Sequence, residues 1–154
     1  MKDQHLEIKA TIQISKPAHE VFEAIVDPLK MLNYFISKST GRMDENKSLI
    51  WHFPEFDIEV PVRVGKIHQD KYVSYYWHAE NGDELLVEML LSPRDHDQAT
   101  LIIVTEKSRD NDEAGIKWLK SNTEGWANFL ACLKAYLEYG INLRKGAFDF
   151  MKTN

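Results

Sequence analysis

Residues 122–141, NTEGWANFLACLKAYLEYGI, decide the fold of this chain. The apolar positions recur with the i, i+3, i+4, i+7 spacing of an amphipathic helix. They are Trp126, Phe129, Leu130, Leu133, Leu137 and Ile141. Asn122 or Thr123 is a suitable N-cap, and Gly140 marks the end of the helix. A helix that carries Trp and Phe on one face needs a wide apolar surface to pack against.

The preceding residues predict a sheet that supplies this surface. Apolar and polar residues alternate with a period of two, which is typical of half-buried strands. The expected strands cover residues 6–14, 49–53, 58–64, 73–77, 85–91 and 101–104. Asn81-Gly82 is a strong hairpin signal between two of them. Pro61 has no amide hydrogen, so its strand should lie at an edge or be bulged there.

The remaining segments predict short helices and loops. Pro17 begins a helix that Asp27-Pro28 ends, and a second short helix should cover residues 29–34. Residues 108–112 are expected to form a charged loop, followed by a short helix over residues 113–120 ahead of the main one. The chain is thus predicted to be a single α+β domain over residues 1–154. Its antiparallel sheet would wrap around one long C-terminal helix.

Composition and charge exclude several classes of partner. The chain has 154 residues, of which 44% are hydrophobic, and this fits one globular domain. A net charge of −5 without a basic stripe argues against nucleic acid. No apolar run could span a bilayer, and no signal-peptide core follows Met1-Lys2-Asp3, so we expect a cytoplasmic protein without membrane insertion. The single cysteine, Cys132, is expected to be a packed thiol.

Three motifs carry a resemblance to a known family. The first is residues 12–22, IQISKPAHEVF, and the second is Tyr75-Tyr76-Trp77 before the hairpin. The third is Thr123-Glu124-Gly125-Trp126, followed by Leu130, Leu133 and the helix end YLEYG. Together they resemble the START-like (SRPBCC) helix-grip superfamily, in the branch homologous to the activator of the ninety-kilodalton heat-shock chaperone ATPase. One departure is Leu32-Asn33-Tyr34-Phe35, where relatives often carry a Trp-Phe pair.

The resemblance implies a fold and leaves two functions open. Members of the superfamily bind lipids, sterols and hormones, act as polyketide cyclases, or serve as co-chaperone modules, and the fold alone does not select among these. We expect a small apolar or amphipathic ligand in a cavity between sheet and helix. The alternative is a protein-interaction module that stimulates a chaperone ATPase, and we rank this partner lower. A homodimer is left open.

The sequence offers little that indicates metal binding or catalysis. The six histidines include no His-x-His pair and no His-Glu-x-x-His motif. Most carboxylates fall on the polar phase of the strands, whereas general acid–base catalysis would require carboxylates in a dry site. We therefore expect no metal, no cofactor and no enzymatic activity.

The inward-facing aromatic residues can be interpreted in two ways. They either fill a solid core or line a cavity, and Tyr75 has a hydroxyl that would orient a ligand's polar group. The candidate ligand-binding residues are Trp51, Phe53, Val60, Val62, Tyr75, Trp77, Val87, Met89, Trp126, Phe129, Leu130 and Leu133.

Overall fold

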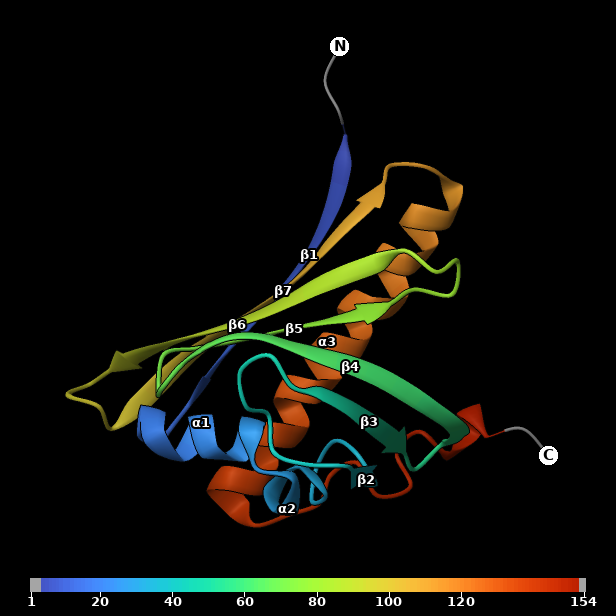
Figure 1. The fold of residues 1–154 in the computed structure, drawn as a ribbon. Helices are drawn as coiled ribbons and strands as arrows, with labels where there is room; N and C mark the ends of the chain where they lie inside the picture. The colour runs from blue at the N-terminus through green and yellow to red at the C-terminus, as the bar shows by residue number, and fades with distance from the viewer. Residues whose placement is uncertain (1–3, 153–154) are drawn as a thin grey trace.

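The computed structural model describes residues 4–152 and confirms the α+β helix-grip fold. One seven-stranded antiparallel sheet has the order β1-β7-β6-β5-β4-β3-β2, and the helices α1, α2 and α3 lie on the same side of it (Figure 1). The elements are β1 (His5–Ile14), α1 (Ala18–Val26), α2 (Pro28–Met31), β2 (Lys38–Ser39), β3 (Ser48–Phe53), β4 (Phe56–His68), β5 (Tyr72–His78), β6 (Glu84–Arg94), β7 (Ala99–Asp110), α3 (Glu113–Tyr139) and the 3-10 helix η1 (Asp149–Met151). The expectation of no signal peptide depends partly on Met1-Lys2-Asp3. These residues lie outside the part of the chain that the structure describes.

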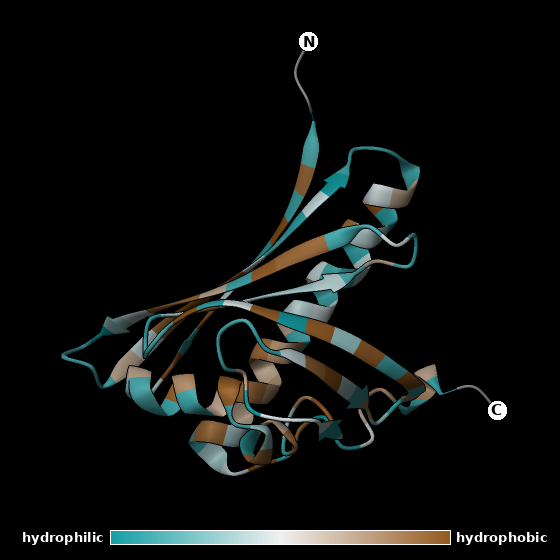
Figure 2. Cartoon of the chain, viewed as in Figure 1, coloured by the Kyte–Doolittle hydropathy of each residue, from teal (hydrophilic) through white to brown (hydrophobic). Residues whose placement is uncertain are grey.

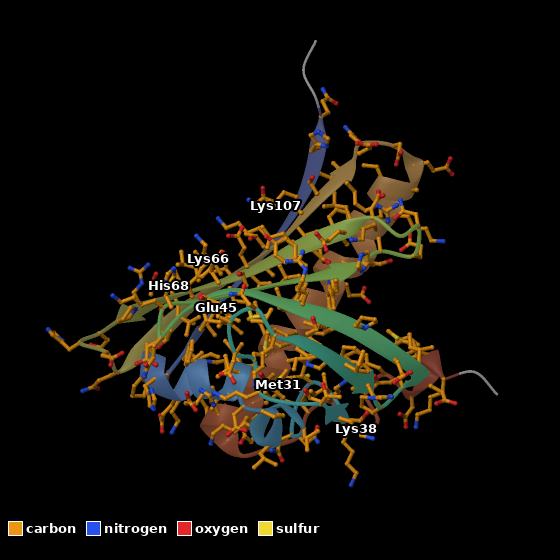
Figure 3. The ribbon with its side chains drawn as sticks, in the orientation of Figure 1. Met31, Lys38, Glu45, Lys66, His68 and Lys107 are labelled. Atoms are coloured by element: carbon orange, nitrogen blue, oxygen red, sulfur yellow. The ribbon has the colours of Figure 1, made fainter. Side chains whose placement is uncertain are left out.

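The alternating strands present one apolar face to α3. Hydrophobic and hydrophilic residues follow each other along β4 (Figure 2), and buried Tyr75 of β5 lies opposite buried Val87 of β6. The polar side chains of Lys66 and Lys107 lie on the outer side of the sheet, whereas Met31 lies among the helices (Figure 3). The hairpin at Asn81-Gly82 is also confirmed, since Gly82 has a φ of 90° in the turn between β5 and β6.

Helix α3 is one continuous helix of 27 residues. The expected division into a short helix over residues 113–120 and a separate main helix is therefore wrong. Asp112 is the N-cap, and its side chain accepts a hydrogen bond of 2.7 Å from the Gly115 N–H. Asn122 and Thr123, which the sequence suggests as caps, lie inside the helix because the apolar stripe begins about two turns before Trp126, at Trp118. Gly140 ends the helix as predicted, in the left-handed conformation with a φ of 64°.

Gly115 allows the start of α3 to approach the end of β7. A Cβ atom at this position would lie 1.9 Å from the backbone oxygen of Asp110, so a side chain would force the backbone to move. We expect Gly115→Ala to lower the free energy of unfolding by about 1–3 kcal/mol, in spite of the higher helix propensity of alanine. Urea denaturation measures this change. A variant as stable as the unaltered chain would contradict such a close approach.

Strand β7 is longer than the sequence indicates. Residues 108–110, expected in a charged loop, continue the strand because β1 pairs with it to the end, with Leu6 opposite Arg109 and His5 opposite Asp110. The backbone hydrogen bonds of this ladder outweigh the polar composition of the segment. As a consequence, Glu106 and Arg109 are buried, at 0% and 6% exposure.

Strand β4 is paired on only one side near Pro61. It lies between β3 and β5 in the sheet, so it is not an edge strand over its whole length. Ile50 of β3 lies opposite Pro61, whereas the pairing with β5 begins only at Arg63. The first half of β4 therefore behaves as a local edge, where a proline is tolerated. This divergence of β4 from β5 opens one end of the sheet.

The short elements after β1 differ in detail from the expectation. The second helix, α2, ends at Met31 and not at Tyr34, and the residues that follow form hydrogen-bonded turns. The two-residue strand β2 was not predicted, because two residues are too few to show a period. Among residues 4–152, no helix is long and apolar enough to cross a membrane.

Candidate functional site: a pocket between β4, β5 and α3

A pocket of about 370 Å³ lies where β4 diverges from β5, against the first half of α3. Its walls come from β3 to β7, from α3, from the turn before β2 and from the segment after α3. The lining consists of Phe35, Phe53, Phe56, Ile58, Val60, Trp77, His78, Ala79, Glu80, Leu85, Glu106, Trp118, Asn122, Gly125, Trp126, Phe129 and Arg144. Phe56 and Ile58 are 41% and 58% exposed, so this side of the pocket is open to solvent.

The twelve candidate residues divide between this pocket and the packed core. Those that line the pocket are Phe53, Val60, Trp77, Trp126 and Phe129. The other seven do not line it and are buried in the core; they are Trp51, Val62, Tyr75, Val87, Met89, Leu130 and Leu133. The sheet and α3 thus enclose both a buried hydrophobic core and a pocket.

Helix α3 contributes one face to the pocket. Trp118, Asn122, Gly125 and Phe129 follow one another at spacings of four, three and four residues, which places them on the same side of a helix. Gly125 is the one position in this series without a side chain. A Cβ atom at Gly125 would have no atom within 4 Å. The missing side chain therefore leaves open space in the middle of the wall.

Aromatic rings form the inner wall. Phe35 and Phe129 meet edge to face with their ring centroids 4.7 Å apart, and Trp126 packs against Phe129 at 5.2 Å. The indoles of Trp77 and Trp126 lie 5.8 Å apart at an angle of 34°. Phe35 belongs to the segment Leu32-Asn33-Tyr34-Phe35, and it lines the pocket. These contacts fix the ring orientations and leave apolar surface facing the open space.

Glu106 is the buried polar group of the pocket. Its Oε1 atom accepts hydrogen bonds from Trp126 Nε1 at 2.9 Å and from Asn122 Nδ2 at 3.0 Å, and its Oε2 atom accepts one from Trp77 Nε1 at 2.7 Å. Sequence reasoning missed this residue, although Ile102, Val104 and Glu106 share the inward phase of one strand. A carboxylate in phase with buried apolar residues was the signal that could have identified it.

Tyr75, expected to orient a ligand, lies behind the pocket wall. Its hydroxyl is buried without a hydrogen-bond partner among the described residues, and burial, followed by the negative charge of Glu106, raises the pKa of Tyr75 well above its ordinary value. Trp118 Nε1 is likewise buried and unpaired within residues 4–152, and Trp118 does line the pocket. Glu106 and Trp118 thus line the open space, whereas Tyr75 does not.

The segment after α3 closes one end of the pocket. Gly140 turns the chain back, and Arg144 then donates hydrogen bonds of 2.6 and 3.2 Å to the carboxylate of Glu55, in the turn between β3 and β4. The guanidinium also lies over the rings of Phe53 and Phe148, at 5.7 and 5.0 Å from their centroids. Arg144 therefore ties the C-terminal segment to the sheet at the pocket mouth.

The part of the chain that the structure describes shows no cluster of side chains that could bind a metal ion. Residues 4–152 contain no group of three or more His, Cys, Asp or Glu side chains placed to hold a metal ion. His78 is the histidine of the pocket lining, and Cys132 is a buried free thiol whose pKa is raised by burial.

Known proteins share this architecture. A protein from Staphylococcus saprophyticus is 27% identical, with a TM-score of 0.79, and the match covers 90% of this chain and 96% of that one. The Aha1 dimer from Colwellia psychrerythraea is 16% identical with a TM-score of 0.74, over 88% and 98% of the two chains. DynU16, a protein in the dynemicin biosynthetic locus, is 21% identical with a TM-score of 0.76, over 88% of this chain and 48% of its own.

These likenesses differ in what they show. The two matches below 25% identity show the fold alone, and this chain spans about half the length of DynU16. No curated protein matches the chain. A family model described as "Activator of Hsp90 ATPase homolog 1-like protein" matches residues 15–138, from the end of β1 almost to the end of α3. The chain therefore belongs to this family, within the START-like (SRPBCC) helix-grip superfamily.

Proposed function

We propose that this protein binds a small apolar or amphipathic molecule in the pocket between β4, β5 and α3. The observation that carries the proposal is an aromatic pocket of about 370 Å³ with one buried carboxylate in its wall. Small-molecule sites in proteins are typically apolar clefts of roughly 300–1,000 Å³ with a few placed polar groups. Of the twelve candidate residues, Phe53, Val60, Trp77, Trp126 and Phe129 would contact the ligand. The other seven would support these walls from the core.

Binding without catalysis is the simpler role for this site. A general acid–base pair needs two carboxylates that share a dry site. The second buried carboxylate, Glu55, is occupied by the two hydrogen bonds from Arg144. We propose that the chain is a single domain, because the sheet, α1 and α3 share one hydrophobic core. A location in the cytoplasm is proposed from the sequence alone.

Titration calorimetry with naphthylethanol tests the proposal. This probe has an apolar bicyclic ring of a size that suits the pocket and a single hydroxyl. We expect one saturable site with a dissociation constant in the micromolar range, accompanied by a change in tryptophan fluorescence because Trp77 and Trp126 line the pocket. Glycerol, which has hydroxyls and no apolar ring, serves as the control. The absence of saturable heat with naphthylethanol would refute the binding function.

The description of the family supports a second function, stimulation of the ATPase of an Hsp90-type chaperone. The same preparation can be added to the chaperone from the same organism while ATP hydrolysis is followed. We rank this function below ligand binding and expect no change of rate. A reproducible several-fold stimulation, together with an absence of naphthylethanol binding, would reverse the ranking.

A further inference from the structure

Glu106 is a buried charge without a counter-charge. Its carboxylate is 0% exposed, and within residues 4–152 no Lys, Arg or His nitrogen lies within the ion-pair distance of 4.0 Å. All three of its hydrogen-bond partners are neutral N–H donors. A carboxylate has about four acceptor positions, so one remains after these three bonds. Burying a charge without an opposite charge costs free energy. A ligand in the pocket can supply the positive charge that Glu106 lacks.

The other charges of the lining are already balanced. Arg144 is paired with Glu55, and Glu80 at the mouth is paired with Arg109 at 3.0 Å. The unpaired Nε1 of Trp118 adds a neutral donor and leaves the charge of Glu106 uncompensated. The lining therefore carries one net negative group, and it lies on the inner wall.

The indoles beside Glu106 leave one acceptor position of the carboxylate without a donor. Trp77 and Trp126 donate their in-plane indole N–H groups to it, so the ring edges meet the carboxylate. An ammonium group has three donors and no acceptor, and it can donate to the remaining position.

Asn122 lies beside Glu106 in the pocket lining. Its side chain lines the pocket, is half-buried, and makes one of the three bonds to the carboxylate. An ammonium group that enters the pocket can take the place of this amide on Oε1, and it supplies the opposite charge that the neutral amide lacks.

We propose that the pocket selects an amphipathic amine, whose ammonium group binds Glu106 in place of the Asn122 amide while its apolar part lies between α3 and the first half of β4. This inference rests on the proposed function and adds the chemical class of the ligand. It also explains what the pocket rejects, since a carboxylate ligand of the same shape would meet Glu106 with a like charge.

Three probes with one ring system test the inference by calorimetry at neutral pH: naphthylethylamine, naphthylethanol and naphthylacetate. We expect the amine to bind at least about tenfold more tightly than the alcohol, which corresponds to about 1.4 kcal/mol, and the carboxylate to bind most weakly. Equal affinities for the amine and the alcohol, or tighter binding of naphthylacetate, would overturn the inference while the proposed function stands. If none of the probes binds, the proposed function fails and the inference fails with it.

Two variants test whether Glu106 is the source of the preference for the amine over the alcohol. Glu106→Gln should reduce the ratio of amine to alcohol affinity to about one, since the charge is the source of the preference. Asn122→Ala should raise this ratio several-fold because it uncovers the carboxylate, and it tests the inference even if Glu106→Gln does not fold. Glu84→Gln is the matched control, since Glu84 lies outside the pocket lining and is paired with Arg63 on the surface. An unchanged ratio in both Glu106→Gln and Asn122→Ala would contradict the role of Glu106.

Discussion

Arg144→Met is expected to lower the free energy of unfolding by about 3–5 kcal/mol, the usual cost of removing one partner of a buried ion pair. The side chain of Glu55 is 2% exposed and that of Arg144 is 15% exposed, so solvent cannot replace the lost partner. The variant would leave the Glu55 carboxylate buried without its two charge-assisted hydrogen bonds. It would also release the C-terminal segment from the pocket mouth. Urea denaturation followed by tryptophan fluorescence measures the change.

Two controls separate this effect from the loss of packing. The double variant of Glu55→Met and Arg144→Met should recover most of the stability, because replacing both charges with apolar groups is often neutral. Arg63→Met removes a similar pair on the surface, where the side chains of Arg63 and Glu84 are 52% and 43% exposed, and should cost less than about 1 kcal/mol. If Arg144→Met costs no more than Arg63→Met, Arg144 does not tie the C-terminal segment to the sheet.

Gly125→Phe is expected to reduce the affinity for naphthylethanol by about a hundredfold or more without destabilising the fold, because its ring would occupy the pocket. Gly125 lies between Asn122 and Phe129 on the pocket face of α3, where a Cβ atom would have no atom within 4 Å. The substitution also replaces the residue with nearly the lowest helix propensity. Loss of binding and retained stability are therefore expected together, a combination that a solid core could not give.

Gly125→Ala is the matched control for this experiment. It adds only one methyl group, leaves most of the pocket open, and should raise the free energy of unfolding by about 0.5–1 kcal/mol through helix propensity. The contrast with Gly115 on the same helix is informative, since there a Cβ atom would meet a backbone oxygen at 1.9 Å. A loss of several kcal/mol in Gly125→Phe would show that this face of α3 is packed and not open.

The strands and the long helix could be predicted because their signals are local. The period of two in residues 85–91 and the hairpin at Asn81-Gly82 depend on neighbouring residues alone, and the structure places both as expected. The helix boundaries were less predictable. Asn122 and Thr123 look like a cap in sequence, but Asp112 takes that role because the chain already turns at the end of β7.

The pocket was only partly predictable because it depends on contacts between distant segments. Phe129 and Trp126 could be assigned from helical spacing, and both line the pocket. Arg144 and Glu55 are 89 residues apart, and no local pattern connects them. Glu106 lies between the expected strand over residues 101–104 and the expected loop over residues 108–112, and the true length of β7 is set by its pairing with β1. Gly125 belongs to the Thr123-Glu124-Gly125-Trp126 motif in the sequence, and only the structure shows the open space beside it.

If the open space beside Gly125 holds the ligand, a side chain that fills this space must abolish binding. Naphthylethanol is titrated by calorimetry into the unaltered chain, Gly125→Ala and Gly125→Phe, after urea denaturation has shown that all three are folded. We predict one saturable site in the first two proteins and none in Gly125→Phe. Equal binding by Gly125→Phe, or no binding by the unaltered chain, would contradict the assignment of this pocket as the binding site.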